Sequence, residues 1–305
     1  MIGVALGRPR GRHLVTSLLE HEAVLASADF LRRVHGFEVT YVEVEPDGSI
    51  TPDALRAALR ADTTLVSLAY ANNEIGTVAD IAALASVAHE HGVPFHSDGV
   101  QAAGWLPLAG LGVDALSLAG HKVGAPKGVG VAAIRGRLPV EPVIHGGGQE
   151  RGRRSGTENV AFAVAFATAF ELAEREREAA ARRVTEARDV LIDRVLAGVP
   201  GAFLTGSRVS RLPNHASFCF GMTSGEAVLL ELERLGVTAS SGSACAAGSD
   251  EPSHVLTALG IAAEVAQTSV RFTFPASAER QHGVVAADAV IEATRSLTSA
   301  FGAPR

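Results

Sequence analysis

The chain has 305 residues, which allows one large or two medium domains, and its formal net charge is −6 at pH 7. This acidic balance argues against a general nucleic-acid-binding protein, and no apolar run is long enough to suggest a membrane-spanning segment. The only cysteines are Cys219 and Cys245, so we expect no disulfide framework and a cytoplasmic location.

Short apolar runs alternate with amphipathic helical patterns along the first half of the chain. Thr51 and Pro52 predict a helix start, because a threonine side chain caps the first turn and proline fits within it. The alternation predicts an α/β fold with a mostly parallel sheet covered by helices. Expected strands are residues 13–17, 37–44, 64–70, 93–98, 115–119 and 128–134, and expected helices are 23–35, one starting at 51, and 80–91.

The pattern changes near Phe162. A long, charged helix is expected from there, with a solvated face that bridges two domains. The sequence beyond it predicts a smaller α/β domain. We therefore predict a large domain over residues 1–162, and an interdomain helix with a small C-terminal domain over residues 163–305. Expected elements are helix 163–196, strand 215–220, helix 225–235, a Ser/Gly/Ala loop at 239–249, strand 269–274 and helix 278–301.

Lysine is restricted to two positions, Lys122 and Lys127, whereas the other basic side chains, histidine aside, are arginine. An ammonium can lose its proton and attack a carbonyl, but a guanidinium cannot. One of the two is therefore interpreted as a nucleophilic amine, most simply a Schiff-base lysine. Arginine-rich codon usage that leaves two lysines at random is the alternative.

Polar residues follow the predicted parallel strands at their carboxyl ends, where ligands bind in open α/β sheets. Asn73 follows one strand, Asp98 ends the next, and Lys122 follows a third. A carboxylate and an amine at neighbouring strand ends favour a pyridoxal phosphate site, because the aldehyde needs an amine and the pyridinium nitrogen needs a carboxylate. Alone, Asp98 is more typical of a helix cap and Asn73 of a turn.

Cysteine occurs in two different settings. Cys245 ends the loop segment Ser-Ser-Gly-Ser-Ala-Cys, where a thiolate could attack a substrate. Cys219 lies in a predicted strand and is interpreted as a small core residue.

Several motifs spread through the chain resemble those of the cysteine desulfurases. These are pyridoxal phosphate enzymes of aminotransferase class V, and the resemblance implies pyridoxal phosphate fold-type I. The Ser-Ser-Gly-Ser-Ala-Cys segment resembles the group with the longer, flexible catalytic loop. The motifs are Glu20-His-Glu-Ala-Val24, Asn72-Asn-Glu-Ile-Gly76, Asp98-Gly-Val-Gln101, Gly120-His-Lys122, Gly146-Gly-Gly-Gln-Glu-Arg151, Arg154-Ser-Gly-Thr157 and Ser240-Ser-Gly-Ser-Ala-Cys245.

The resemblance implies three catalytic residues and two substrate contacts. Lys122 is expected to form the Schiff base and move the Cα proton, and His21 to stack on the pyridine ring and assist acid–base steps. Cys245 is expected to attack the substrate sulfur, which leaves L-alanine and an enzyme persulfide. Arg271 is expected to clamp the carboxylate of L-cysteine, with Asn73 close to substrate and cofactor. Lys127 then has no catalytic role.

The remaining implied contacts hold the cofactor. Asp98 is expected to pair with the pyridinium nitrogen, Gln101 to hydrogen-bond the ring hydroxyl, and His121 to contact the phosphate. Thr157 is expected to reach the phosphate of the neighbouring subunit in a homodimer. No resident metal is expected, although Cys245 could ligate an iron–sulfur cluster transiently.

The chain departs from the family in two ways that bear on cofactor binding. Family members run roughly a quarter longer, mainly at the front, so we expect an N-terminally truncated form that lacks a phosphate-binding turn. Ala119 replaces the phosphate-binding serine three residues before Lys122. The lost hydrogen bond to a charged group corresponds to roughly 1.5–3 kcal/mol of cofactor binding.

Two alternatives to a cysteine desulfurase stay open. One is a selenocysteine lyase or another β-eliminating pyridoxal phosphate enzyme. The other is an inactive remnant or a regulatory interaction protein. The sulfur acceptor is equally open between an iron–sulfur scaffold, a tRNA thiolation enzyme and a biosynthetic sulfur carrier, because no motif reports acceptor docking.

Overall fold

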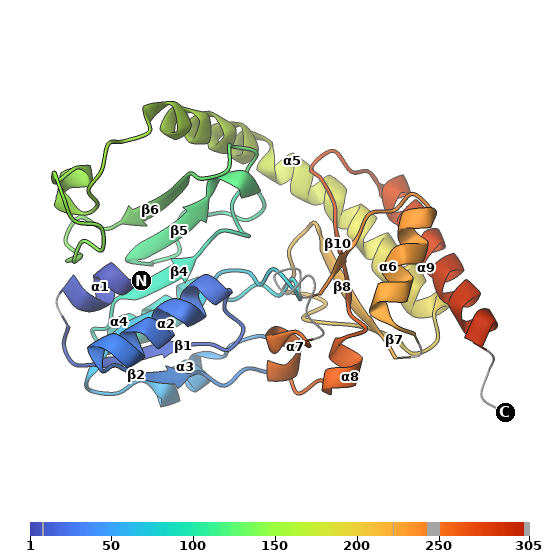
Figure 1. Ribbon diagram of the computed structural model, residues 1–305, viewed down its shortest axis with the longest axis horizontal. Helices are drawn as coiled ribbons and strands as arrows, with labels where there is room; N and C mark the ends of the chain where they lie inside the picture. Colours follow the sequence, from blue (N-terminus) through green and yellow to red (C-terminus); the bar gives the residue numbers. More distant parts are fainter. Residues whose placement is uncertain (8, 222, 243–250, 302–305) are drawn as a thin grey trace. The chain divides into compact units, whose positions relative to one another are not determined.

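The computed structural model describes residues 1–7, 9–221, 223–242 and 251–301 (Figure 1). The chain divides into two compact units, which are described separately. The first unit comprises Met1–Glu45, Ile50–Asn72 and Ala79–Arg175. The second comprises Pro46–Ser49, Asn73–Val78 and Glu176–Arg305.

Within the described part of the first unit, six strands form one sheet, here called the large sheet, in the order β2-β1-β3-β4-β5-β6. Strands β1 to β5 pair in parallel, and β6 runs antiparallel to β5. The predicted mostly parallel sheet is thereby confirmed. The strands are β1 (His13–Thr16), β2 (Glu38–Tyr41), β3 (Thr63–Ala69), β4 (Phe95–Asp98), β5 (Ala115–Ala119) and β6 (Gly130–Ile134).

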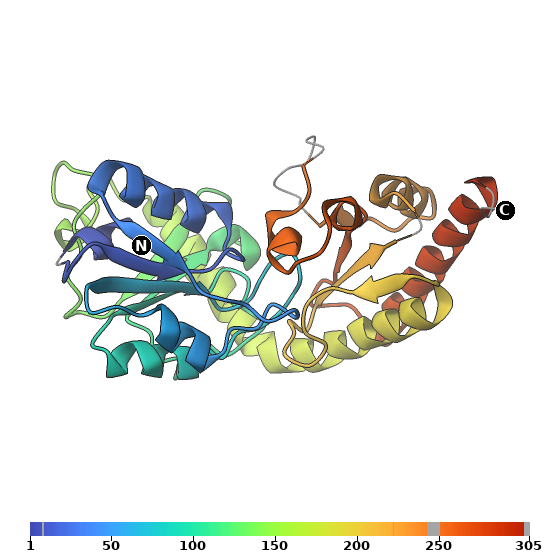
Figure 2. The ribbon, with the colours of Figure 1, turned by 90° about the horizontal axis from the view of Figure 1, so that it is seen from below.

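Helices cover both faces of the large sheet. Figure 2 shows α2 on one face, and α3 with α4 on the other. The predicted helix signals act as expected: Thr51 caps α3 by accepting from the backbone of Ala54, and Gly36 ends α2 with a φ of 65°. The elements are α1 (Ile2–Gly7), α2 (Glu22–His35), α3 (Pro52–Ala58), α4 (Ile81–Glu90) and the 3₁₀ turns η1 (Gly120–Lys122) and η2 (Glu150–Gly152).

The second unit contains an antiparallel sheet, here called the small sheet. Its described strands follow the order β7-β8-β10-β9, and every residue of β8 is buried. Helices α6 and α9 pack against each other beside it. The strands are β7 (Ala202–Leu204), β8 (His215–Phe220), β9 (Ser240–Ser241) and β10 (Val270–Thr273), and the helices are α6 (Gly225–Arg234), α7 (His254–Ala258), α8 (Ala263–Ala266) and α9 (Arg280–Phe301).

Helix α5 (Val160–Gly198) belongs partly to each unit. The first unit extends along it to Arg175, whereas the sequence predicted a domain boundary at residue 162. The part of α5 within the first unit is held there by Glu174, which accepts a hydrogen bond from the backbone of Gly104 at 3.3 Å. Among the described residues, no helix is both long and apolar enough to cross a membrane.

Candidate functional site

The carboxyl edge of the large sheet brings Asp98 and the segment before Lys122 onto neighbouring strands. Asp98 ends β4 and pairs in register with Ser117 of β5. Strand β5 ends at Ala119, and η1 follows immediately with His121 and Lys122, both exposed. Asp98 and Lys122 therefore lie at or just beyond the carboxyl ends of neighbouring strands.

A glycine makes the turn before Lys122 possible. The Gly120 backbone donates to the carbonyl of Val129 at 2.9 Å. A Cβ at Gly120 would lie 2.7 Å from Cγ1 of Val129, which is closer than real contacts allow. The close approach holds η1 against the segment that leads to β6, and this fixes where the Lys122 backbone emerges.

The Asp98 carboxylate is half-buried and has a raised affinity for protons. Its Oδ1 accepts a hydrogen bond from the backbone of Val100 at 2.9 Å. Burial raises the pKa of Asp98, while the Val100 bond and the charge of His21 act in the opposite direction. When ionised, a carboxylate at this strand end can accept a hydrogen bond from a protonated ring nitrogen and stabilise its positive charge.

His21 lies at the start of α2, also in the first unit. Its Nδ1 accepts from the backbone of Ala23 at 3.1 Å, so His21 caps the helix. In the neutral ring the proton is then on Nε2, and the side chain is exposed. Gln101 is half-buried one turn after Asp98, and Thr157 is exposed shortly before α5.

Glu20 is a buried carboxyl that sequence reasoning did not assign a role. Its Oε1 accepts from Oγ of Ser17 at 2.9 Å and from the backbone of Ala69 at 3.0 Å. Burial raises the pKa of Glu20 to about 8, and the charge of Asp98 adds to the rise. Glu20 thus ties the loop that carries His21 to the end of β3, which pairs with Asp98. Its position directly before His21 was the available signal.

The second unit brings together Asn73 and Arg271, which the sequence assigned to the substrate. Arg271 lies in β10, and its Nη1 donates to the backbone carbonyl of Asn73 at 3.1 Å. The contact involves the main-chain carbonyl of Asn73 and not its side chain. His215 also donates to that carbonyl, a contact the sequence did not predict.

The segment leading to Cys245 begins beside Arg271. Ser240 pairs with Arg271 in the small sheet, so the start of the predicted 239–249 loop is a strand, β9. Gly242 then donates to the carbonyl of Ser269 at 3.2 Å, and a Cβ there would lie 2.0 Å from Oγ of Ser269. Cys245 itself lies outside the described residues.

The remaining predicted residues have simple surroundings. Cys219 is fully buried in β8, and burial raises the pKa of its thiol to about 12, as expected of a core cysteine. Lys127 is exposed in the turn before β6. No group of three or more histidine, cysteine, aspartate or glutamate side chains suited to a metal ion occurs within the described residues.

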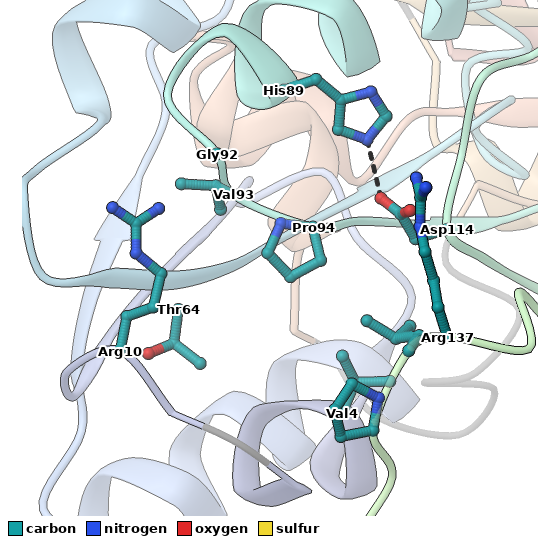
Figure 3. Close-up of a pocket in the computed structure, with 11 residues that line it drawn as sticks. Val4, Arg10, Thr64, His89, Gly92, Val93, Pro94, Asp114 and Arg137 are labelled. Atoms are coloured by element: carbon teal, nitrogen blue, oxygen red, sulfur yellow. Dashed lines mark hydrogen bonds and ion pairs between the residues drawn. The ribbon is translucent and has the colours of Figure 1, made fainter.

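A pocket of about 440 Å³ lies at the opposite edge of the large sheet (Figure 3). Thr64, Pro94 and Asp114 line it at the amino ends of β3, β4 and β5. His89 closes one wall through a 2.7 Å contact with Asp114. Ligands of parallel α/β sheets bind at the carboxyl ends, so this pocket is separate from the predicted site.

The chemistry of the residues along the carboxyl edge fits pyridoxal phosphate at its ring and aldehyde end. Lys122 supplies an exposed amine, Asp98 a carboxylate with a raised pKa, and His21 an exposed imidazole. The fit is poorer at the phosphate end, because the Ala119 side chain at the end of β5 has no hydroxyl to donate a hydrogen bond.

The fold is that of a class-V aminotransferase. The aminotransferase class-V family model matches residues 2–282, and the chain belongs to that family. Within it, the chain is a homologue of the cysteine desulfurases. It is 46% identical over 266 residues to the cysteine desulfurase IscS of Dictyoglomus turgidum, and 42% identical over 312 residues to an IscS-like cysteine desulfurase of Mycobacterium tuberculosis.

These matches span most of this chain but less of each relative. The alignment covers 87% of this chain and 67% of the Dictyoglomus protein, and 97% of this chain and 78% of the Mycobacterium protein. The chain is thus shorter than its relatives, in line with the expectation from the sequence.

Solved structures agree with the sequence comparisons. A NifS-like protein superposes with a TM-score of 0.86 at 32% identity, covering 97% of this chain and 78% of that chain. A structure of SspA in complex with cysteine superposes with a TM-score of 0.73 at 32% identity, covering 87% of this chain and 74% of that chain. The predicted pyridoxal phosphate fold-type I architecture is thereby confirmed.

Proposed function

We propose that this chain binds pyridoxal phosphate through Lys122 and Asp98 and converts L-cysteine to L-alanine, with the sulfur passing to Cys245. The observation that carries the proposal is the placement of Lys122 and Asp98 at adjoining strand ends in a cysteine desulfurase homologue. When bound, the cofactor supplies an electron sink for the substrate carbon atoms.

The residues of the first unit have proposed tasks in binding and proton transfer. Lys122 would supply the amine that holds the cofactor aldehyde, and it would carry the substrate Cα proton. Asp98 would face the ring nitrogen, where its negative charge would stabilise a protonated ring. His21 lies against the ring, with Gln101 at the ring hydroxyl and His121 at the phosphate. The exposure of Lys122, His121 and His21 leaves them accessible to such a ligand.

The second unit supplies the substrate side of the proposal. The Arg271 guanidinium, which contacts the Asn73 carbonyl, binds the L-cysteine carboxylate. The Cys245 thiolate attacks the substrate sulfur, so that a sulfur–sulfur bond forms and the carbon–sulfur bond breaks. The carbon keeps the electron pair and takes up a proton, which gives the methyl group of L-alanine. The start of β9 beside Arg271 supports this assignment, because it places the origin of the Cys245 segment near the clamp.

A pair of lysine variants tests the proposal directly. Purified protein supplied with pyridoxal phosphate should turn yellow and release L-alanine from L-cysteine. Lys122→Ala should lose both properties, whereas Lys127→Ala, the matched control, should keep them. A colourless wild-type protein, or a Lys122→Ala variant indistinguishable from it, contradicts the proposal and favours the inactive alternative.

Three broader features are part of the same proposal. We propose a homodimer in which Thr157, exposed before α5, reaches the cofactor phosphate of the other subunit. The names of the IscS relatives support a sulfur acceptor of the iron–sulfur scaffold type. Sedimentation with and without cofactor, and transfer of ³⁵S from L-cysteine to a scaffold protein, measure these two features. The low cysteine content supports a reducing, cytoplasmic setting.

A further inference from the structure

The backbone carbonyl of Asn73 accepts hydrogen bonds from two side chains of the second unit. Arg271 Nη1 donates to it at 3.1 Å, and His215 Nε2 donates to it at 3.1 Å. A carbonyl oxygen has two lone pairs, so both bonds can form at once. The histidine therefore contacts the same atom that orients the arginine of the proposed substrate clamp.

The surroundings of His215 fix which ring nitrogen carries the proton. A carbonyl only accepts, so Nε2 must donate to Asn73. On the other side, Nδ1 faces Nη1 of Arg211 at 3.5 Å, and a guanidinium only donates. Burial, together with the charges of Arg211 and Arg271, lowers the pKa of His215 well below its ordinary value. The ring is thus a neutral Nε2–H tautomer.

Arg211 is itself held in place by backbone carbonyls. Its guanidinium donates to the carbonyls of Ser207 at 2.7 Å and His215 at 3.4 Å, and also to the carbonyl of Thr205. Arg188 donates to the carbonyl of Leu212 at 3.0 Å in the same segment. This network leaves little freedom for the buried edge of the His215 ring.

The turn from Asn73 to Val78 is docked on the same segment. Gly76 accepts from the backbone of Leu212 at 2.9 Å, and Val78 donates to the carbonyl of Ser210 at 2.8 Å. Gly76 has a φ of 76°, and a Cβ there would lie 2.5 Å from Nδ1 of His215. The turn therefore needs glycine both for its backbone conformation and for the space that the imidazole occupies.

We propose that His215 is a positioning residue for substrate binding: its Nε2–H holds the Asn73 carbonyl, which in turn orients the Arg271 guanidinium. This inference rests on the proposed function of Arg271 as the carboxylate clamp. Because Arg271 Nη1 donates to the Asn73 carbonyl, a shift of that carbonyl changes the orientation of the guanidinium that the proposed function assigns to the substrate carboxylate. His215 is buried, so its proposed action on the substrate runs through the Asn73 carbonyl.

Variants at His215 separate the Nε2 donor from the rest of the ring. In His215→Gln the side-chain amide nitrogen occupies the place of Nε2, whereas in His215→Asn it occupies the place of Nδ1. His215→Leu removes both polar atoms. We expect the Gln variant to resemble wild type, while the Asn and Leu variants lose the bond to Asn73. Thermal unfolding identifies which variants fold, and the Gln/Asn pair suffices if the Leu variant does not.

The binding readout compares L-alanine with ethylamine, which differ by the carboxylate. In the cofactor-loaded protein, His215→Asn should weaken L-alanine binding on the order of 5- to 10-fold, measured by absorbance titration, and leave ethylamine binding unchanged. KM for L-cysteine should rise by a similar factor at nearly constant kcat. Equal losses for both amines, or no loss of L-alanine binding, would overturn the proposal.

A readout without cofactor separates this inference from the proposed function. The ¹⁵N resonances of the Arg271 guanidinium, assigned with Arg271→Lys, should shift or broaden in His215→Asn and stay unchanged in His215→Gln. Unchanged Arg271 signals in both variants would refute the positioning role. A wild-type protein that shows no spectral response to either amine would refute the proposed function, while the Arg271 signals still decide the role of His215.

Discussion

Replacing the buried Glu20 carboxyl by an amide should change how the stability of the first unit depends on pH. The Glu20 pKa is raised from 4.5 to about 8 in the folded chain, mainly by burial. The folded chain therefore keeps the Glu20 proton over a range in which the unfolded chain releases it. Stability from this group is fully present below about pH 4.5 and is lost as the pH rises toward 8.

The size of the effect follows from the width of that range. Each pH unit inside it corresponds to about 1.36 kcal/mol, so the wild-type chain should lose about 3 kcal/mol between pH 5 and pH 7.5. Glu20→Gln has no proton to release and should lack this loss. The Gln oxygen can still accept from Ser17 and from the backbone of Ala69, so the local contacts on Oε1 are kept.

Fluorescence of Trp105 provides the assay, because it is the only tryptophan and lies in the first unit. Urea unfolding of wild type and Glu20→Gln at pH 5, 6, 7 and 7.5 gives the difference in unfolding free energy at each pH. As the pH rises from 5 to 7.5, the unfolding free energy of the variant should increase relative to that of wild type. Glu22→Gln, at an exposed neighbouring position, is the matched control and should show a flat difference. A flat difference for Glu20→Gln as well would refute the reasoning.

The other predictions concern the cofactor site and the cysteines. Ala119→Ser places a hydroxyl at the end of β5 and should tighten pyridoxal phosphate binding about 10- to 100-fold, measured by absorbance titration. Unchanged affinity would count against a phosphate contact at this position. Asp98→Asn should keep the yellow colour but lower L-alanine formation on the order of 100-fold or more, so full activity would exclude the ring-nitrogen role. Cys219→Ala should cost about 1 kcal/mol of stability and leave sulfur transfer intact. Cys245→Ala should abolish sulfur transfer. If instead Cys219→Ala abolishes transfer and Cys245→Ala does not, Cys219 is the nucleophile.

Local sequence signals predicted the large sheet and one edge of the site well. Buried apolar runs fixed strands β3 to β5, and the chain direction common to parallel strands placed Asp98 and Lys122 at the same edge. Thr51 and Gly36 ended helices for stereochemical reasons that act within a few residues. Helices α7 and α8 were missed, because segments of four or five residues are too short to show a helical period.

The contacts that a single sequence did not reveal join residues far apart in the chain. His215 and Arg271 lie 142 and 198 positions from Asn73, and neither spacing leaves a local pattern. His215 reads as one polar residue at the start of an apolar strand, which is more typical of an edge position than of a fully buried ring. Its burial follows from the docking of the Asn73–Val78 turn on the segment before β8, which only the folded chain contains.

The turn from Asn73 to Val78 also gives a structural role to the motif residues that follow Asn73. Glu74 is buried and accepts a hydrogen bond from Oγ of Ser253 at 2.5 Å, and Thr77 accepts from the backbone of Ser207 at 2.9 Å. Gly76 leaves room for the His215 ring. Each of these residues fastens the turn to the rest of the second unit, and the Asn73 carbonyl links the turn to Arg271. The glycine and the acid of this motif therefore act on the clamp through the backbone, so a substitution at Gly76 should affect carboxylate binding before it affects cofactor binding.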